Sequence, residues 1–168
     1  TNEAVDEAEV IMLILLFASI SLLCYAEFRS VAAVLCIVVP LAIVAVLCNA
    51  LMATLGIGLK VSTLPVVALG VGVGVDYGIY LFERMKHSLA DGESLQDAFH
   101  KALQQRGTAA MFTAVTMSIS VGTWAFSALK FQADMGILLA FLFMVNMLGA
   151  IFVLPALAAF LVKDKKST

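Results

Sequence analysis

The sequence predicts an all-α, polytopic membrane helix bundle of five transmembrane helices. Of its 168 residues, 62% are apolar and 13% are charged, whereas a soluble domain carries about 45–50% apolar and about 25% charged residues. Five membrane spans of roughly 20 residues need on the order of 100 apolar positions, which is close to the number present. The apolar runs are too long and too unalternating for barrel strands, so they indicate helices. This composition excludes a secreted disulfide module and an ordinary cytosolic enzyme, and the net charge of -2 excludes a nucleic-acid partner.

The five apolar runs give the expected helices, which form a single transmembrane domain over 1–168. They fall at about 10–26, 31–55, 61–82, 108–129 and 135–162. We expect the acidic segment from Glu3 to Glu9 to extend the first helix outside the bilayer. Pro40 lies inside the second run, where it removes a backbone donor and is expected to kink the helix.

The distribution of Lys and Arg predicts the orientation. Eight of these residues fall in connections on one side and two on the other. Because Lys and Arg accumulate in cytoplasmic loops, we expect an outside N-terminus and a cytoplasmic C-terminus. The first group comprises Arg29, Arg84, Lys86, Lys101, Arg106, Lys163, Lys165 and Lys166, and the second comprises Lys60 and Lys130.

The polar connection at 84–107 contains a short amphipathic segment. Ser94 with Asp97 three residues later is typical of a helix N-terminus. Apolar residues then recur at helical spacing from Leu95 to Leu103. We expect a short amphipathic helix on the cytoplasmic face, or alternatively a solvated linker helix without a partner.

Asp76 is the acidic residue that lies deep inside a predicted span, while the other acids lie at helix ends or in loops. A carboxylate at the centre of a span costs about 2.5–3.5 kcal/mol on insertion scales, so it indicates function by default. Since desolvation disfavours the charged form, such a group is suited to take up and release a proton. Tyr77 follows at once and offers a hydroxyl at similar depth.

Glycines surround this carboxyl. Gly70, Gly74 and Gly78 recur every fourth residue, which predicts a smooth ridge for close helix packing. Gly72 lies one turn before Asp76 and leaves space beside the carboxyl. The spacing does not match the GxGxxG pattern of a nucleotide site.

Hydroxyl side chains form a second pattern, on the fourth predicted helix. Thr113, Thr116, Ser120, Thr123 and Ser127 recur at intervals of three and four. They form either a polar lane that leads protons or water to Asp76, with Thr116 the best candidate, or a set of small residues that pack tightly and bond to their own helix.

Metal binding and proteolysis are not indicated. The cysteines Cys24, Cys36 and Cys48 stand singly inside apolar runs, so neither a metal site nor a redox pair is expected. An intramembrane aspartyl protease needs two membrane aspartates, whereas Asp134 lies at the outer boundary. We therefore expect no enzyme.

The segment Gly72-Val-Gly-Val-Asp76-Tyr77, with the Glu83-Arg84 ending, resembles exporters of the resistance–nodulation–division (RND) superfamily. The likeness is greatest to the MmpL-type and hopanoid-exporter-like branch. Weaker similarities occur in the same order elsewhere, as in Glu27-Phe28-Arg29-Ser30 and Leu154-Pro155-Ala156-Leu157.

The resemblance implies that the five helices are the last five of the C-terminal half, without that half's first helix and porter domain. It implies that Asp76 and Tyr77 belong to a proton relay that uses the proton motive force, with H⁺ as coupling ion and no cofactor. The implied partners are the lipid bilayer, the N-terminal half, the porter domain and a hydrophobic or lipid substrate. A bacterial inner membrane location follows, and an oligomer is compatible with it.

Two alternatives share this architecture. One is a membrane subunit similar to the SecD/SecF protein-export family, and the other is a non-transporting domain similar to sterol-sensing proteins. In the second case Asp76 would have a structural role.

Overall fold

The computed structural model describes residues 2–57 and 63–163. Within these ranges it contains helices and no strand. The helices are α1 (Asn2–Phe28), α2 (Val31–Thr54), α3 (Leu64–Ala90), α4 (Leu95–Ala102), α5 (Thr108–Gly122) and α6 (Lys130–Lys163), with a π-helical turn at Leu103–Gly107 and a 3₁₀ turn at Thr123–Phe126. Five helical segments here are long and apolar enough to cross a membrane, which confirms the predicted fold class.

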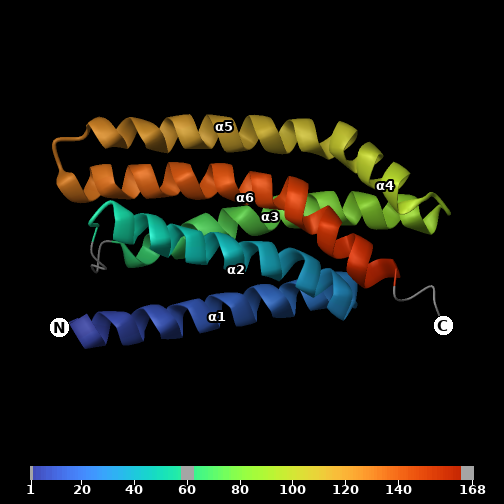
Figure 1. Ribbon diagram of the computed structural model, residues 1–168, viewed down its shortest axis with the longest axis horizontal. Helices are drawn as coiled ribbons and strands as arrows, with labels where there is room; N and C mark the ends of the chain where they lie inside the picture. Colours follow the sequence, from blue (N-terminus) through green and yellow to red (C-terminus); the bar gives the residue numbers. More distant parts are fainter. Residues whose placement is uncertain (1, 58–62, 164–168) are drawn as a thin grey trace.

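The helices lie side by side in one bundle around α6, which contacts α2, α3 and α5 (Figure 1). The N-terminus, the end of α2 and the α5–α6 connection lie at one end of the bundle. The α1–α2 turn, the α3–α4 turn and the C-terminal end of α6 lie at the other. This alternation is the arrangement expected of successive membrane crossings.

The helix bounds differ from the sequence expectations mainly at the ends. α1 begins at Asn2 and α3 continues to Ala90, beyond the predicted end at 82. The expected start of the third span at 61 lies outside the described residues. α2 runs without interruption through Pro40.

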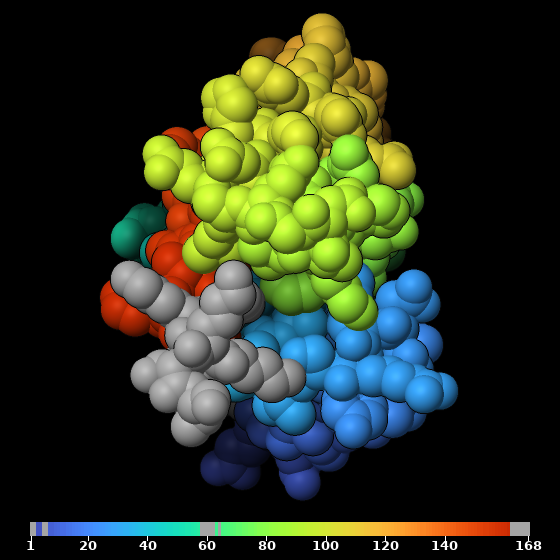
Figure 2. Space-filling view, turned by 90° about the vertical axis from the view of Figure 1, so that its right-hand side faces the viewer, coloured from blue at the N-terminus to red at the C-terminus, as the bar shows by residue number. Residues whose placement is uncertain are grey.

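α3 and α4 form a hairpin at the end of the bundle opposite the N-terminus. Gly92 turns the chain with a φ of 86°, a left-handed conformation that glycine adopts at little cost. Ser94 then caps α4, because its Oγ accepts the backbone N–H of Asp97 at 3.2 Å, as the sequence predicts. The apolar side of α4 packs against α3, and Ala98 and Ala102 are fully buried. Figure 2 looks onto this end, where the yellow-green hairpin lies between α5 and the blue α1–α2 turn.

The α5–α6 connection begins and ends earlier than predicted and includes a 3₁₀ turn. α5 ends at Gly122 rather than near 129, and α6 begins at Lys130 rather than 135. Gly136 explains the close approach, since a Cβ there would lie 2.6 Å from the Val121 carbonyl oxygen. Ser127 closes the turn by accepting the N–H of Leu129 at 3.2 Å.

α1 is held to α3 by aromatic and cationic contacts at the hairpin end. The rings of Phe28 and Phe82 meet edge to face, with centroids 5.1 Å apart. The Lys86 ammonium lies 5.4 Å from the centroid of the Phe28 ring and donates to the Phe28 carbonyl oxygen at 3.3 Å. These contacts fix the C-terminal half of α3, which follows Asp76.

Candidate functional site

Asp76 lies midway along α3, and its side chain is exposed on the bundle surface. It opens into a groove of about 340 Å³ between α3 and the start of α5. The groove is lined by Val73, Asp76, Tyr77, Tyr80, Arg106, Ala109, Ala110, Thr113 and Met117. A carboxyl within a membrane-spanning helix therefore faces a partly polar surface that the described residues leave open.

Tyr77 behaves differently from its neighbour. It contributes to the groove wall, but its side chain is only 3% exposed. Successive helical residues point about 100° apart, so Asp76 faces outward while Tyr77 packs inward. Among the described residues the Tyr77 hydroxyl has no hydrogen-bond partner, which leaves a donor available beside the carboxyl.

The predicted polar lane divides in the structure. Thr113 lies in the groove with Asp76, whereas Thr116 and Ser120 do not line it. The hydroxyls of Thr113 and Ser120 donate to carbonyl oxygens of their own helix, Ala109 at 3.0 Å and Thr116 at 2.8 Å. Of this series, Thr113 is thus the hydroxyl that lines the Asp76 groove.

The two outermost hydroxyls of the predicted series leave the helical face. Thr123 lies in the 3₁₀ turn, and Ser127 follows it in extended conformation, so the regular α-helical spacing is lost beyond Gly122.

Arg106 is the cation that lines the same groove. From the sequence, Arg106 is expected only as a loop charge that orients the chain. It belongs to the π-helical turn that joins α4 to α5, and such turns are frequent at functional sites. The signal available in the sequence was its spacing, because Arg106 precedes Thr113 by seven residues, about two helical turns.

The glycine ridge contacts two helices. A Cβ on Gly70 would lie 2.4 Å from the Leu142 side chain, and one on Gly74 would lie 2.4 Å from the Asn146 amide. Gly78 faces α2 instead, at Ile37, with 3.2 Å available. Gly72 has open space around its Cβ position, as expected for a residue on the Asp76 side.

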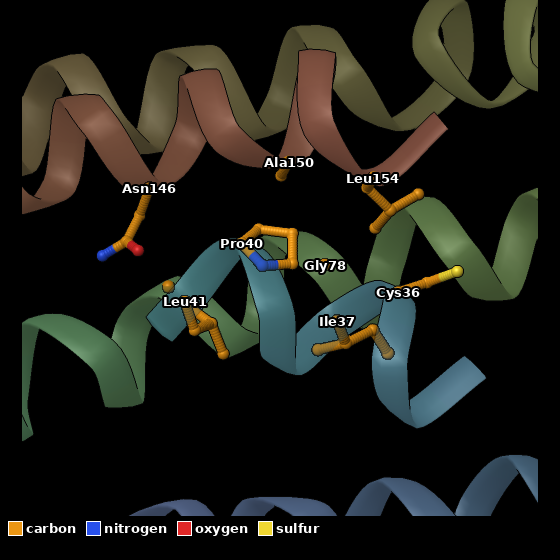
Figure 3. Close-up of a pocket in the computed structure, with 9 residues that line it drawn as sticks. Cys36, Ile37, Pro40, Leu41, Gly78, Asn146, Ala150 and Leu154 are labelled. Carbon is orange, nitrogen blue, oxygen red and sulfur yellow. The ribbon is translucent and has the colours of Figure 1, made fainter. Parts of the chain in front are cut away.

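Asn146 is a buried polar residue at the centre of these contacts. It is 3% exposed, and its Nδ2 donates to the Gly70 carbonyl oxygen at 2.8 Å. Its side chain extends from α6 into the space between α2, α3 and α6, where it lines a cavity of about 10 Å³ together with Pro40 and Gly78 (Figure 3). The hydrogen bond fixes α3 against α6 at Gly70, almost two helical turns before Asp76.

A buried carboxyl, that of Glu9, was not predicted from the sequence. Glu9, expected outside the bilayer, is 7% exposed because α1 packs this position against α2. Asn49 of α2 donates to its Oε1 at 3.4 Å. Because Glu9 lies next to the start of an apolar run, it resembles an ordinary acidic residue at a helix end in the sequence.

Metal ligands are not grouped in the described part of the chain, where no three His, Cys, Asp or Glu side chains come together. Cys24, Cys36 and Cys48 are buried and free, and they lie on α1 and α2, away from the groove.

The sequence matches the model of the MMPL family over residues 1–167. Among curated proteins, it is 30% identical over 90 residues to the probable transport protein MmpL12 of Mycobacterium tuberculosis, which is 54% of this chain and 8% of that protein. It is 29% identical over 118 residues to a membrane protein of Methanocaldococcus jannaschii, covering 70% of this chain and 30% of the other. A membrane protein of Streptomyces coelicolor is 28% identical over 89 residues, 53% of this chain and 13% of its own length. The matched region thus spans a minor part of each relative.

Proposed function

Because the chain belongs to the MMPL family and is a multi-pass transporter domain, we propose that it couples proton movement to export rather than acting as an enzyme. In this proposal Asp76 takes up and releases the proton, with Tyr77 as its hydroxyl neighbour. The observation that carries the proposal is the position of Asp76, an intramembrane carboxyl that opens into the α3–α5 groove. A carboxyl at such depth is retained where it serves transport or signalling.

The surrounding side chains suit a protonation cycle. When Asp76 is charged, the Arg106 guanidinium in the same groove opposes its charge, and when Asp76 is neutral the local balance becomes positive. The two states therefore favour different arrangements of α3 against α5. Thr113 and Tyr80 add hydroxyls along the same wall, where they can exchange hydrogen bonds with an entering proton carrier such as water.

The proton motive force can supply the energy for such a cycle. A membrane potential of 100 mV supplies about 2.3 kcal/mol for each proton that crosses. In the proposed orientation the N-terminus lies outside, the C-terminus lies in the cytoplasm, and the membrane is the bacterial inner membrane. The groove would then be covered by the N-terminal half of the complete transporter, and a porter domain would capture a hydrophobic or lipid substrate.

The test is Asp76→Asn in the complete transporter, which keeps the shape of the side chain but removes its proton exchange. We expect proton uptake into proteoliposomes, followed with a pH-sensitive dye, and export to fall by roughly 100-fold, the loss typical when a proton-transferring group is removed.

The matched control is Asp91→Asn, which removes an exposed carboxyl at the C-terminal end of the same helix. It should leave both activities near the parent level. Unchanged proton-coupled export in the Asp76→Asn variant, at normal expression and helicity, would refute the relay assignment.

A further inference from the structure

Two adjoining hollows lie at the α4 end of the bundle, outside the Asp76 groove, and share His100 and Gln104. One is a crevice of about 430 Å³ between α5 and α6, and the other is a hollow of about 330 Å³ over α4. The crevice is lined by His100, Leu103, Gln104, Gly107, Thr108, Met111, Met147, Leu148, Ile151 and Phe152. The hollow over α4 is lined by Glu93, Asp97, His100, Lys101 and Gln104. Together they form one amphipathic site with an apolar part and a polar part.

The apolar part lies in the half of the membrane nearest α4. Met111 is in the first turn of α5, and Phe152 lies 22 residues beyond the start of α6, roughly 33 Å along that helix. The side chains of Phe152, Met111 and Leu148 are 68%, 47% and 43% exposed, so the crevice opens sideways, toward the surrounding lipid. Its volume falls in the roughly 300–1,000 Å³ range of small-molecule sites.

The π-helical turn Leu103–Gly107 connects the two parts. It adds width to the helix between α4 and α5, and residues from it line the crevice. Gly107 and Leu103 lie in direct contact there, since a Cβ on Gly107 would be 2.7 Å from the Leu103 side chain. The backbone of this turn therefore forms the junction at which a ligand would pass from an apolar to a polar environment.

The polar part carries both signs of charge, with an excess of carboxylates. Lys101 forms an ion pair with Glu93, and the Asp97 carboxylate accepts the Ser94 hydroxyl at 2.6 Å. His100 and Gln104 contact each other through their side-chain nitrogens at 3.0 Å and provide N–H donors. Two carboxylates against one ammonium favour a ligand with a cationic group, and the nearby donors suit a phosphate.

We propose that this crevice binds one phospholipid with an ammonium headgroup, its acyl chain between α5 and α6 and its headgroup over α4. The polar part lies over α4, at the end of the bundle, and the apolar part lies deeper, between α5 and α6. A lipid in the leaflet on the α4 side would have its headgroup and its acyl chain at these two positions. The charge at the polar end distinguishes this ligand from an anionic lipid, which would meet Glu93 and Asp97 unfavourably. The proposal is independent of proton coupling, because the site shares none of its residues with the Asp76 groove.

The experiment uses the complete protein in nanodiscs that contain phosphatidylethanolamine, phosphatidylglycerol and phosphatidylcholine. A trace of phosphatidylethanolamine or phosphatidylglycerol carries a diazirine in its acyl chain, and adducts are mapped by peptide mass spectrometry. We expect adducts on segments 103–111 and 147–152 to be about threefold to fivefold more abundant with the phosphatidylethanolamine probe, the preference that one exposed ion pair can provide.

Two variants test the two ends of the site. Leu148→Trp fills the apolar part and should remove most of these adducts, whereas Ile119→Trp, at an exposed position of α5 outside the crevice, should not. Asp97→Asn leaves the Ser94 cap in place and should abolish the preference between the probes. Equal labelling by both probes, or adducts spread evenly over exposed helix faces, would overturn the proposal. Complete exclusion of both lipids from the crevice would do the same, because it would show that another protein segment fills it.

Discussion

Gly74 and Gly72 lie two residues apart on α3, yet the structure predicts opposite results when each is replaced by alanine. A Cβ on Gly74 would overlap the Asn146 amide at 2.4 Å, whereas one on Gly72 meets no heavy atom within 4 Å. The pair therefore tests whether close packing of α3 against α6, rather than glycine content as such, supports the helix that carries Asp76.

The magnitude for Gly74→Ala follows from three contributions. Overpacking a well-filled interface costs about 1–3 kcal/mol. Displacing Asn146 weakens its hydrogen bond to the Gly70 carbonyl oxygen, and such interhelical bonds in membranes contribute about 0.6 kcal/mol, with a maximum near 1.7. Alanine returns up to about 1 kcal/mol through its higher helix propensity. We expect a net loss of about 1–4 kcal/mol for Gly74→Ala, and a change between zero and a gain of about 1 kcal/mol for Gly72→Ala.

The measurement is reversible unfolding of the protein in mixed micelles, with the SDS fraction raised and helicity followed by circular dichroism. A double variant with Asn146→Ala provides an internal check, because shortening this side chain makes room for the new methyl group. The cost of Gly74→Ala should then be smaller in that background, as expected for residues in contact. Equal destabilisation by the two glycine substitutions would refute the packing argument.

Two further predictions use the same unfolding assay. Ser118→Ala should lower stability by about 0.6 kcal/mol, because the Ser118 hydroxyl donates to the Ala140 carbonyl oxygen of α6 at 3.2 Å. The neighbouring Ser120→Ala should change it little, because that hydroxyl bonds within its own helix, and a larger loss for Ser120→Ala would contradict this ranking. Lys86→Met should cost about 0.5–1 kcal/mol by removing the ammonium from the Phe28 ring. An unchanged unfolding midpoint for this variant would mean that the contact contributes no stability.

The fold could be predicted from the sequence because lipid allows few solutions. Apolar runs of membrane length must be helices when no water can satisfy the backbone, and five of them appear in the described residues. Helix ends were less predictable. α3 continues to Ala90 because its last turns pack against α4, and this partner is not visible in a hydropathy pattern.

The candidate site was predictable in part. Asp76 stood out because a carboxyl inside an apolar run is costly, and the glycine spacing indicated a packing ridge. Arg106 and Glu9 were missed for a common reason, since each lies at the edge of a run where charges are ordinary. Their positions depend on how neighbouring helices cross, which places Arg106 in the same groove as Asp76 and Glu9 against Asn49.

The hydroxyl pattern shows the limit of periodicity alone. Spacing places Thr113, Thr116 and Ser120 on adjoining positions of one helix, but it does not indicate which neighbour each one meets. In α5, the groove is lined by Ala109, Ala110, Thr113 and Met117, and not by Thr116 or Ser120. Ser118, outside the series, is the hydroxyl that bonds across to α6.

The exposed face of α1 and the face formed by α3 and α5 are suited to different surroundings. In the most apolar 18-residue stretch of each candidate span, 17% of the residues are buried for α1 and 11% for the α4–α5 segment. The corresponding share is 50% for α3 and for α6. The exposed side of α1 is apolar, with residues such as Ile14, Leu15 and Leu22 more than half exposed, so lipid can cover it without cost. The α3–α5 face instead presents Asp76, and placing a charged carboxylate in hydrocarbon costs about 2.5–3.5 kcal/mol or more. The bundle is therefore expected to keep lipid away from this face by covering it with protein or water, and in the proposed function this cover is the N-terminal half of the transporter.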